Sequence, residues 1–423
     1  MKSTALIIFG VTYVLLLLLP KMRSYISIAS AALFIYLGIV PIYKALQYIN
    51  WNAILMIAGT MGIVSLFIES KMPDKLADIL ISRMPNVKWL VVALSLFAGL
   101  ISAFVDNVAT VLMIAPVAIT IAKKLNISPI AMIISISVSS NLQGAATLVG
   151  DTTSILLAAQ ADMNFMDFFF YNGRPGLFWI VQIGALLSIV VLLYLFRRDL
   201  QHIKIKSETK VEDYFPTVLL LSMISLLILA SFMPHKPEIS NGFICMSLFI
   251  IGSLKYDLKY QNFNTLRTHV KEIDFYTIAL LIGLFVLIGG LTEVGMIEDI
   301  GKLFVRLSND NVFVIYTIIV WASVLFSGFV DNIPYVATML PVTASIASFL
   351  AIDPTVLYFG LLIGATLGGN LTPIGASANI TGIGILRKEG WNVDTGSFMK
   401  IGVPFTLSAV ISGYILVWIL FGI

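Results

Sequence analysis

The sequence predicts an all-α polytopic membrane protein built from two inverted repeats of five spans, each with a re-entrant hairpin and a broken helix. Three observations lead to this fold class. Of the 423 residues, 59% are hydrophobic and only 12% are charged, whereas a soluble protein carries about 25% charged residues. Uncharged apolar runs long enough to span a bilayer recur along the chain. A polar motif from the first half also returns in the second half.

The composition excludes several classes of function. A net charge of +3 gives no basic surface for nucleic acid. A single cysteine rules out a disulfide framework and a cysteine-ligated metal site. The three histidines fall in charged loops, so no histidine metal centre is expected inside the membrane. No Gly-x-x-x-x-Gly-Lys loop for nucleotides occurs, and we expect no enzyme.

We interpret ten apolar runs as transmembrane spans, since a transmembrane helix needs about 20 mostly apolar residues. They are residues 3–20, 24–43, 50–68, 129–160, 176–196, 215–233, 239–254, 275–293, 355–386 and 402–422. Two further stretches, 89–122 and 311–350, are about 35 residues long and carry one polar dipeptide in the middle. We interpret each as a hairpin that enters and leaves the membrane on one side. Two ordinary spans joined by a tight turn are the alternative.

The basic residues predict the orientation of these spans. With ten crossings and two hairpins, 20 of the 26 Lys and Arg residues fall on one face, Arg23 among them. The positive-inside rule makes that face cytoplasmic, so both termini of this cell-membrane protein are predicted to lie outside. No lysine or arginine is expected deep in any span.

The two halves of the chain are related. Ser102-Ala-Phe-Val-Asp-Asn107 returns as Ser327-Gly-Phe-Val-Asp-Asn332, and the valine, proline and alanine at 111, 116 and 122 return in the same register at 336, 341 and 347. A polar linker at 199–214 divides a first repeat, 1–198, from a second repeat, 215–423. Five crossings per half invert the second repeat relative to the first. This plan is typical of secondary transporters, whose site lies near the membrane midplane.

The hairpin tips hold the first candidate site, because ionisable residues inside a membrane are costly and usually functional. The tip residues are Asp106, Asn107, Asp331 and Asn332. Helix capping is the structural alternative for both aspartates, and it still leaves spare carboxylate oxygens. We expect these four residues to bind Na⁺, with Asp151 as the third acidic candidate. Because no basic partner is expected nearby, the aspartates suit Na⁺ or H⁺ directly.

Each hairpin is followed by a long helix with a glycine-rich break. Glycine adopts backbone conformations closed to other residues, so we expect unwound carbonyl groups and new helix N-termini there. Close packing of small residues is the alternative, but it does not explain the polar side chains. The candidate binding residues at the breaks are Asn141, Gly144, Thr147, Gly150, Asp151, Thr152, Ser154, Asn370, Thr372, Gly375, Ser377 and Asn379.

Three stretches, Ser102–Pro116, Ser139–Asp151 and Gly368–Asn379, resemble the ion transporter superfamily. The resemblance covers nearly the whole chain. It is closest to the branch of the melanosomal P protein, arsenite permeases and sodium/proton antiporters, with their citrate-transporter-like domain. The resemblance implies an elevator-type transporter, usually a homodimer, with a fixed scaffold and a moving transport domain.

The expected function is secondary active transport of a small ion or solute through the lipid bilayer, as a permease or antiporter coupled to Na⁺ or H⁺. No other cofactor and no nucleic-acid partner are expected. An anion, carboxylate or arsenite permease is the alternative. An anion needs co-bound cations, because like charges about 4 Å apart repel by about 4 kcal/mol at an effective dielectric of 20.

A channel and an intramembrane protease are the remote alternatives. Channels favour symmetric rings, whereas an inverted internal repeat favours alternating access. Gly150-Asp151 resembles part of the Gly-x-Gly-Asp signature of membrane aspartyl proteases, but Leu148 replaces the first glycine and no Tyr-Asp partner occurs.

Overall fold

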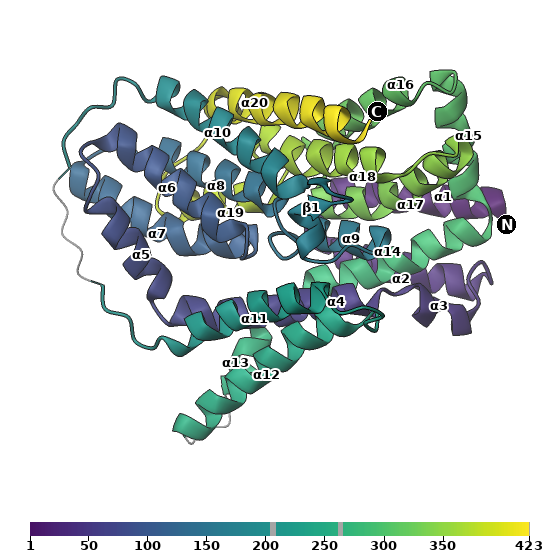
Figure 1. Ribbon diagram of the computed structural model, residues 1–423, viewed down its shortest axis with the longest axis horizontal. Helices are drawn as coiled ribbons and strands as arrows, with labels where there is room; N and C mark the ends of the chain where they lie inside the picture. Colours follow the sequence, from purple (N-terminus) through teal and green to yellow (C-terminus); the bar gives the residue numbers. More distant parts are fainter. Residues whose placement is uncertain (204–208, 261–264, 423) are drawn as a thin grey trace.

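The computed structural model describes residues 1–203, 209–260 and 265–422, and these are nearly all helical (Figure 1). The first half contains α1 (Lys2–Leu18), α2 (Arg23–Tyr36), α3 (Ile42–Tyr48), α4 (Trp51–Glu69), α5 (Met72–Ile81), α6 (Val87–Ser102), α7 (Asn107–Leu125), α8 (Ile130–Gly144), α9 (Thr152–Ala161) and α10 (Leu177–Leu195). Two 3₁₀ turns, η1 (Pro20–Met22) and η2 (Met166–Phe168), and the paired antiparallel strands β1 (Phe170–Tyr171) and β2 (Arg174–Pro175) complete it.

The second half begins after the predicted linker 199–214, of which residues 204–208 lie outside the described residues. It contains α11 (Phe215–Ser231), α12 (Ser240–Tyr260), α13 (Thr265–Lys271), α14 (Phe275–Glu293), α15 (Met296–Ser308), α16 (Val312–Ser327), α17 (Asn332–Leu350), α18 (Thr355–Leu362), α19 (Ser377–Lys388) and α20 (Thr395–Phe421). A π-helical turn, η3 (Ile363–Leu367), and a 3₁₀ turn, η4 (Gly369–Leu371), follow α18.

The helices that are long and apolar enough to cross a membrane do not coincide one to one with the predicted spans. In the described chain, α4, α7, α10, α14, α17 and α20 are long and apolar enough alone, and the bent pairs α1–α2 and α15–α16 raise the number to eight at most. The predicted spans 3–20 and 24–43 form one of these pairs, bent by 116° at Pro20. The helices α6, α8 and α11 are apolar but shorter, as is the segment Thr355–Leu371, which comprises α18, η3 and η4. Length and composition therefore support six to eight apolar spans in the described chain, and the ten predicted crossings, two of them through broken helices, stay a prediction.

The helix bounds of the first half recur in the second. The helices α16 and α17 begin and end at the positions that the register of the repeat assigns to the ends of α6 and α7. The helix α14 matches α4 in the same way, with its bounds displaced from that register by a single position. The contacts recur as well, since α2 packs against α14 while α12 packs against α4. The register of the predicted repeat is therefore visible in the fold, and the inversion of the second half stays a prediction.

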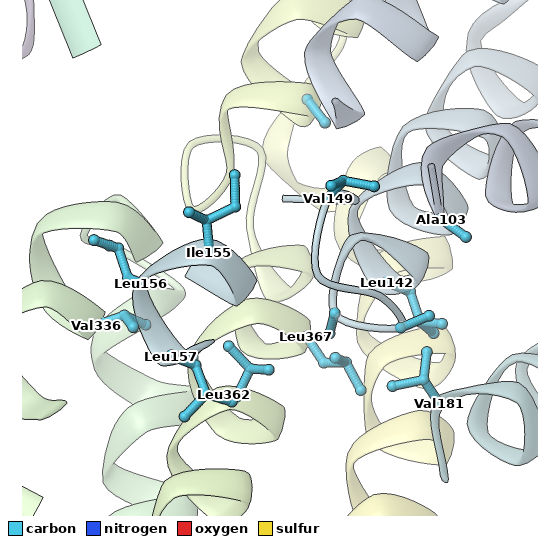
Figure 2. Close-up of a cluster of buried hydrophobic side chains, with 14 of the residues drawn as sticks. Ala103, Leu142, Val149, Ile155, Leu156, Leu157, Val181, Val336, Leu362 and Leu367 are labelled. Carbon is cyan, nitrogen blue, oxygen red and sulfur yellow. The ribbon is translucent and has the colours of Figure 1, made fainter. Parts of the chain in front are cut away.

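The ends of the molecule and its core position the site. Both termini lie toward one end, and the described segments 196–203 and 209–214 that flank α10 and α11 lie at the other end (Figure 1). Buried apolar side chains from both halves surround the break between α8 and α9, among them Leu142, Val149, Ile155, Leu362 and Leu367 (Figure 2). This packing holds the interrupted helix in place, because an apolar core tolerates little displacement.

Candidate functional site

Both polar dipeptides lie at the turn between two helices, as predicted. Asp106 caps α7, and its Oδ1 accepts hydrogen bonds from the backbone N–H groups of Val108 (3.0 Å) and Ala109 (3.1 Å). Asp331 caps α17 through its Oδ1, which accepts from the N–H of Ile333 at 3.1 Å. Both aspartates therefore cap the helices that follow them. Each cap uses only Oδ1, so the second carboxylate oxygen of each aspartate is left for another partner.

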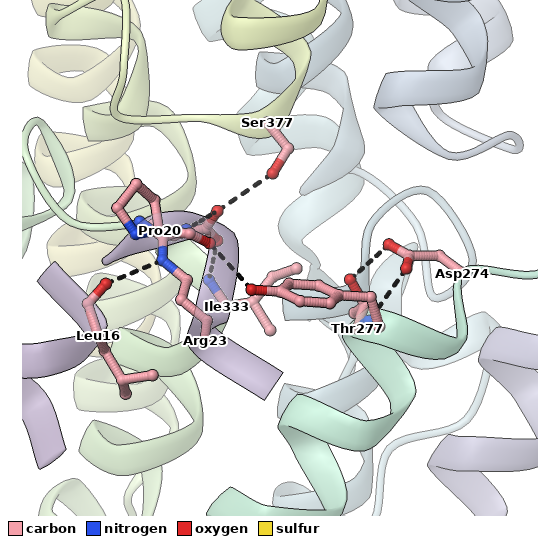
Figure 3. A network of polar contacts seen from close by, with 9 residues as sticks. Leu16, Pro20, Arg23, Asp274, Thr277, Ile333 and Ser377 are labelled. Atoms are coloured by element: carbon pink, nitrogen blue, oxygen red, sulfur yellow. Dashed lines mark hydrogen bonds and ion pairs between the residues drawn. The ribbon is translucent and has the colours of Figure 1, made fainter. Parts of the chain in front are cut away.

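The second oxygen of Asp331 is bound by the side chains of Arg23 and Ser377, both of which are labelled in Figure 3. Arg23 Nη1 lies 2.9 Å from Asp331 Oδ2, and Ser377 Oγ donates to the same oxygen at 3.1 Å. Arg23 Nε also donates to the carbonyl of Leu16 at 3.0 Å. The side chains of Arg23 and Asp331 are only 12% and 8% exposed. Asp331 therefore belongs to a shielded ion pair.

This ion pair corrects one prediction, because the aspartate at the second tip does have a basic partner. The physical reason is the sharp bend at Pro20, which ends α1 and brings the start of α2 against the hairpin tip. The two residues are 308 positions apart, so no local pattern in the sequence indicates the contact.

Asp151 connects the first helix break to the second hairpin tip. It lies between α8 and α9 and is 3% exposed. Its Oδ2 accepts hydrogen bonds from Thr153 Oγ1 at 2.7 Å and from Asn332 Nδ2 at 3.3 Å. No ion pair within the described chain involves Asp106 or Asp151. The absence of a basic partner therefore holds for these two aspartates in the part of the chain that the structure describes.

Buried asparagines join the two breaks. Asn107 Nδ2 donates to Asn141 Oδ1 at 3.1 Å. Asn141 Nδ2 donates to Asn370 Oδ1 at 3.1 Å and to the carbonyl of Thr366 at 2.7 Å. Asn370 Nδ2 donates in turn to the carbonyl of Val138 at 2.9 Å. These amides satisfy backbone groups that an interrupted helix leaves without partners.

The other polar residues at the breaks bind backbone carbonyls in a repeated arrangement. The hydroxyls of Thr147 and Thr372 donate to the carbonyls of Ala103 and Gly328, respectively. Ser154 Oγ donates to the carbonyl of Gly144 at 3.0 Å, and Asn379 Nδ2 donates to that of Gly369 at 3.2 Å. Donors and acceptors in both pairs are equivalent in the register of the repeat. In the structure, these hydrogen bonds stabilise the interrupted backbone at the breaks.

The glycines of the breaks leave no room for a side chain. A Cβ atom on Gly150 would lie 2.8 Å from the carbonyl oxygen of Gly144. On Gly375, it would lie 2.5 Å from the carbonyl oxygen of Ser327 and 2.6 Å from that of Gly369. Close backbone approach therefore explains both glycines.

A cavity of about 190 Å³ reaches the tips and the first break. Six predicted residues line it, namely Asp106, Asn107, Asp151, Thr152, Asn332 and Ser377. Glu272 and Asp274, which precede α14, complete the polar wall. Four carboxylates therefore face one cavity, and none of its described lining residues is basic.

The remaining predicted residues do not belong to the described lining of this cavity, namely Asn141, Gly144, Thr147, Gly150, Ser154, Asp331, Asn370, Thr372, Gly375 and Asn379. Sequence reasoning missed Arg23, Thr153 and Thr366, as well as the two acids before α14. Only Asp274 had a usable signal, since an aspartate directly before an apolar run is a typical helix cap.

The profile of the citrate transporter family matches residues 13–364, which include both hairpin tips and the first break. The chain belongs to the citrate transporter family. As a member of this family it is a membrane transporter. An uncharacterized transporter of Mycobacterium tuberculosis is 28% identical over 437 residues, which cover 99% of this chain and 98% of that protein. The human P protein is 25% identical over 479 residues, which cover 92% of this chain but 56% of the P protein.

Two solved transporters share the fold. The YdaH transporter of Alcanivorax borkumensis has a TM-score of 0.61 at 15% identity, covering 89% of this chain and 87% of its own. MtrF of Neisseria gonorrhoeae, which is described within a class of antimetabolite efflux pumps, has a TM-score of 0.56 at 15% identity, covering 90% and 84%. At this identity the two structures support the fold alone. The predicted resemblance to the ion transporter superfamily is confirmed.

Proposed function

We propose that this member of the citrate transporter family is a secondary transporter in which Asp106 and Asp151 hold a coupling cation, Na⁺ or H⁺. The observation that carries the proposal is the cavity wall, which combines these aspartates with Glu272 and Asp274 and has no basic side chain among its described residues. A carboxylate removed from water without a counter-charge is costly. A cation from solution is the ligand that such a wall favours.

The neighbouring amides fit the same role. Asn107 and Asn332 use their amide nitrogens to donate to Asn141 and Asp151, which leaves their amide oxygens to face a cation. Carboxylate and amide oxygens are ligands that hard cations prefer. Protonation of Asp106 or Asp151 is the equivalent step for H⁺. For either coupling ion, Asp106 supplies the negative charge that balances the ion, and it places the ion at the hairpin tip.

A small carboxylate is the solute that we favour. The helices α9 and α19 begin at the cavity with Thr152 and Ser377, and neither helix has a side-chain cap. Free N–H groups at a helix N-terminus attract anions. Asp106 and Asp151 repel a neighbouring anion unless a cation neutralises the two carboxylates. This requirement couples binding of the anion to binding of the cation. The family's description as citrate transporters also supports this solute.

The membrane arrangement predicted from the basic residues and from the family resemblance belongs to the same proposal. It comprises a basic cytoplasmic face, both termini outside, a homodimer and an elevator motion of the transport domain. An arsenite permease is the alternative for a neutral solute.

Uptake by proteoliposomes tests the proposal. Purified protein should accumulate labelled citrate when an inward gradient of Na⁺ or H⁺ is imposed, and not without one. Asp106→Asn and Asp151→Asn should abolish the response to the gradient, whereas Asp394→Asn, a cap of α20 outside the cavity lining, should keep it. Full gradient-driven uptake by both cavity variants would refute the assignment, and uptake of arsenite alone would favour the alternative solute.

A further inference from the structure

The two hairpin tips have the same sequence but different electrostatic surroundings. Asp106 and Asp331 are equivalent by the repeat, and each uses Oδ1 to cap the following helix. Asp331 Oδ2 receives Arg23 and Ser377. No described residue donates a hydrogen bond to Asp106 Oδ2, and Thr152, the equivalent of Ser377, lines the cavity beside it. Among the described residues, the protein therefore supplies a counter-charge to Asp331 but not to Asp106.

The guanidinium of Arg23 is held in place from two sides (Figure 3). Its Nη1 contacts Asp331 while its Nε donates to the carbonyl of Leu16. The turn that precedes Arg23 is fixed as well, since Tyr276 of α14 donates its hydroxyl hydrogen to the carbonyl of Pro20 at 2.9 Å. With the Arg23 side chain only 12% exposed, this ion pair is shielded from competing ions in solution.

We propose that Arg23 is a tethered cation that occupies the second of two repeat-related cation positions, so that the transporter binds one exchangeable coupling cation and not two. This inference rests on the proposed function of Asp106 and Asp151. An arginine stays protonated at any physiological pH, so the charge at Asp331 cannot be exchanged with solution. A buried carboxylate needs such a counter-charge. At Asp106 the coupling cation supplies it.

The inference makes the number of coupling cations depend on Arg23. Without the guanidinium, Asp331 keeps only its hydrogen bonds with Ser377 and with the N-terminus of α17. Its carboxylate has then lost its counter-charge and needs a cation from solution. Arg23→Gln should therefore create a second cation position at Asp331. In Arg23→Gln/Asp331→Asn both charges are gone, and the single position at Asp106 should be left.

The cation dependence of solute uptake by proteoliposomes tests this inference. The Hill coefficient for the coupling cation should be about one in the wild-type protein and rise toward about two in Arg23→Gln, since the number of sites limits its value. It should return to about one in the double variant and stay at about one in Asp331→Asn. Lys21→Gln, a change at an exposed neighbour, is the matched control and should leave the dependence unchanged.

Several outcomes would overturn the inference. A coefficient near two in the wild-type protein that falls to one in Asp331→Asn would place a second exchangeable cation at Asp331. An unchanged coefficient in Arg23→Gln with only a lower unfolding temperature would reduce the ion pair to a structural contact. If Arg23→Gln does not fold, loss of cation dependence in Asp331→Asn, as in Asp106→Asn, refutes the inference. In these cases the role of Asp106 survives, whereas a wild-type protein without any cation dependence removes both proposals.

Discussion

Asp106 has two roles in this account, and two substitutions separate them. Asp106→Ala removes the acceptor for two backbone N–H groups, at 3.0 and 3.1 Å, and loss of a helix cap costs about 1 kcal/mol of unfolding free energy. Asp106→Asn keeps a carbonyl oxygen at the Oδ1 position and removes only the charge. Both variants should lose the cation dependence of transport, but only Asp106→Ala should lose stability.

The assay combines thermal unfolding of the purified protein in detergent with cation titration of uptake by proteoliposomes. Asp394→Ala provides the matched control, because Asp394 caps α20 through the N–H of Ser397 at 2.9 Å and is exposed. It should lower the unfolding temperature and leave the cation dependence intact. Equal stability of the two Asp106 variants would refute the capping role, and a normal cation dependence in Asp106→Asn would refute the site.

Three further predictions concern the breaks and a loop helix. Gly375→Ala should destabilise the protein by about 1–3 kcal/mol in unfolding assays, because its Cβ would lie 2.5 Å from a carbonyl oxygen, whereas Gly384→Ala in α19, with open space around it, should be neutral or slightly stabilising. Asn141→Leu should cost about 1–3 kcal/mol for each buried polar group that it leaves unpaired, measured the same way. Burial lowers the pKa of His269 in α13, so the unfolded chain binds the proton more readily. The unfolding temperature should therefore fall as the pH drops below about 6.5, and His269→Gln should weaken this dependence.

The sequence predicted the tips and breaks because their signals are local. An acid inside an apolar run, as at Asp106, must cap a helix or bind an ion, and clustered glycines such as Gly150 mark close backbone approach. The aspartates that precede helices and the glycines in close backbone contact both lie at the positions that the repeat predicts. The division between residues that line the cavity and residues that hold the breaks was not visible in the sequence. It depends on which side of each broken helix faces the other repeat.

The contacts that the sequence could not show join distant segments. Arg23 reaches Asp331 only because α1 and α2 bend at Pro20 and pack beside α14. The predicted span boundaries placed Arg23 in a loop with other basic residues, because it stands between the apolar runs 3–20 and 24–43. Hydropathy detects apolar length and does not detect the angle at which two apolar helices meet, so the 116° bend at Pro20 could not be inferred from it.

The measurement that tests the central claim most directly is the charge displaced when purified protein on a solid-supported membrane meets a step in Na⁺ or H⁺ concentration. We predict a transient current with at least one of these cations in the wild-type protein. The current should be absent in Asp106→Asn and in Asp151→Asn, and kept in Asp394→Asn. A wild-type protein that gives no current with either cation, or an undiminished current in both cavity variants, would contradict the account.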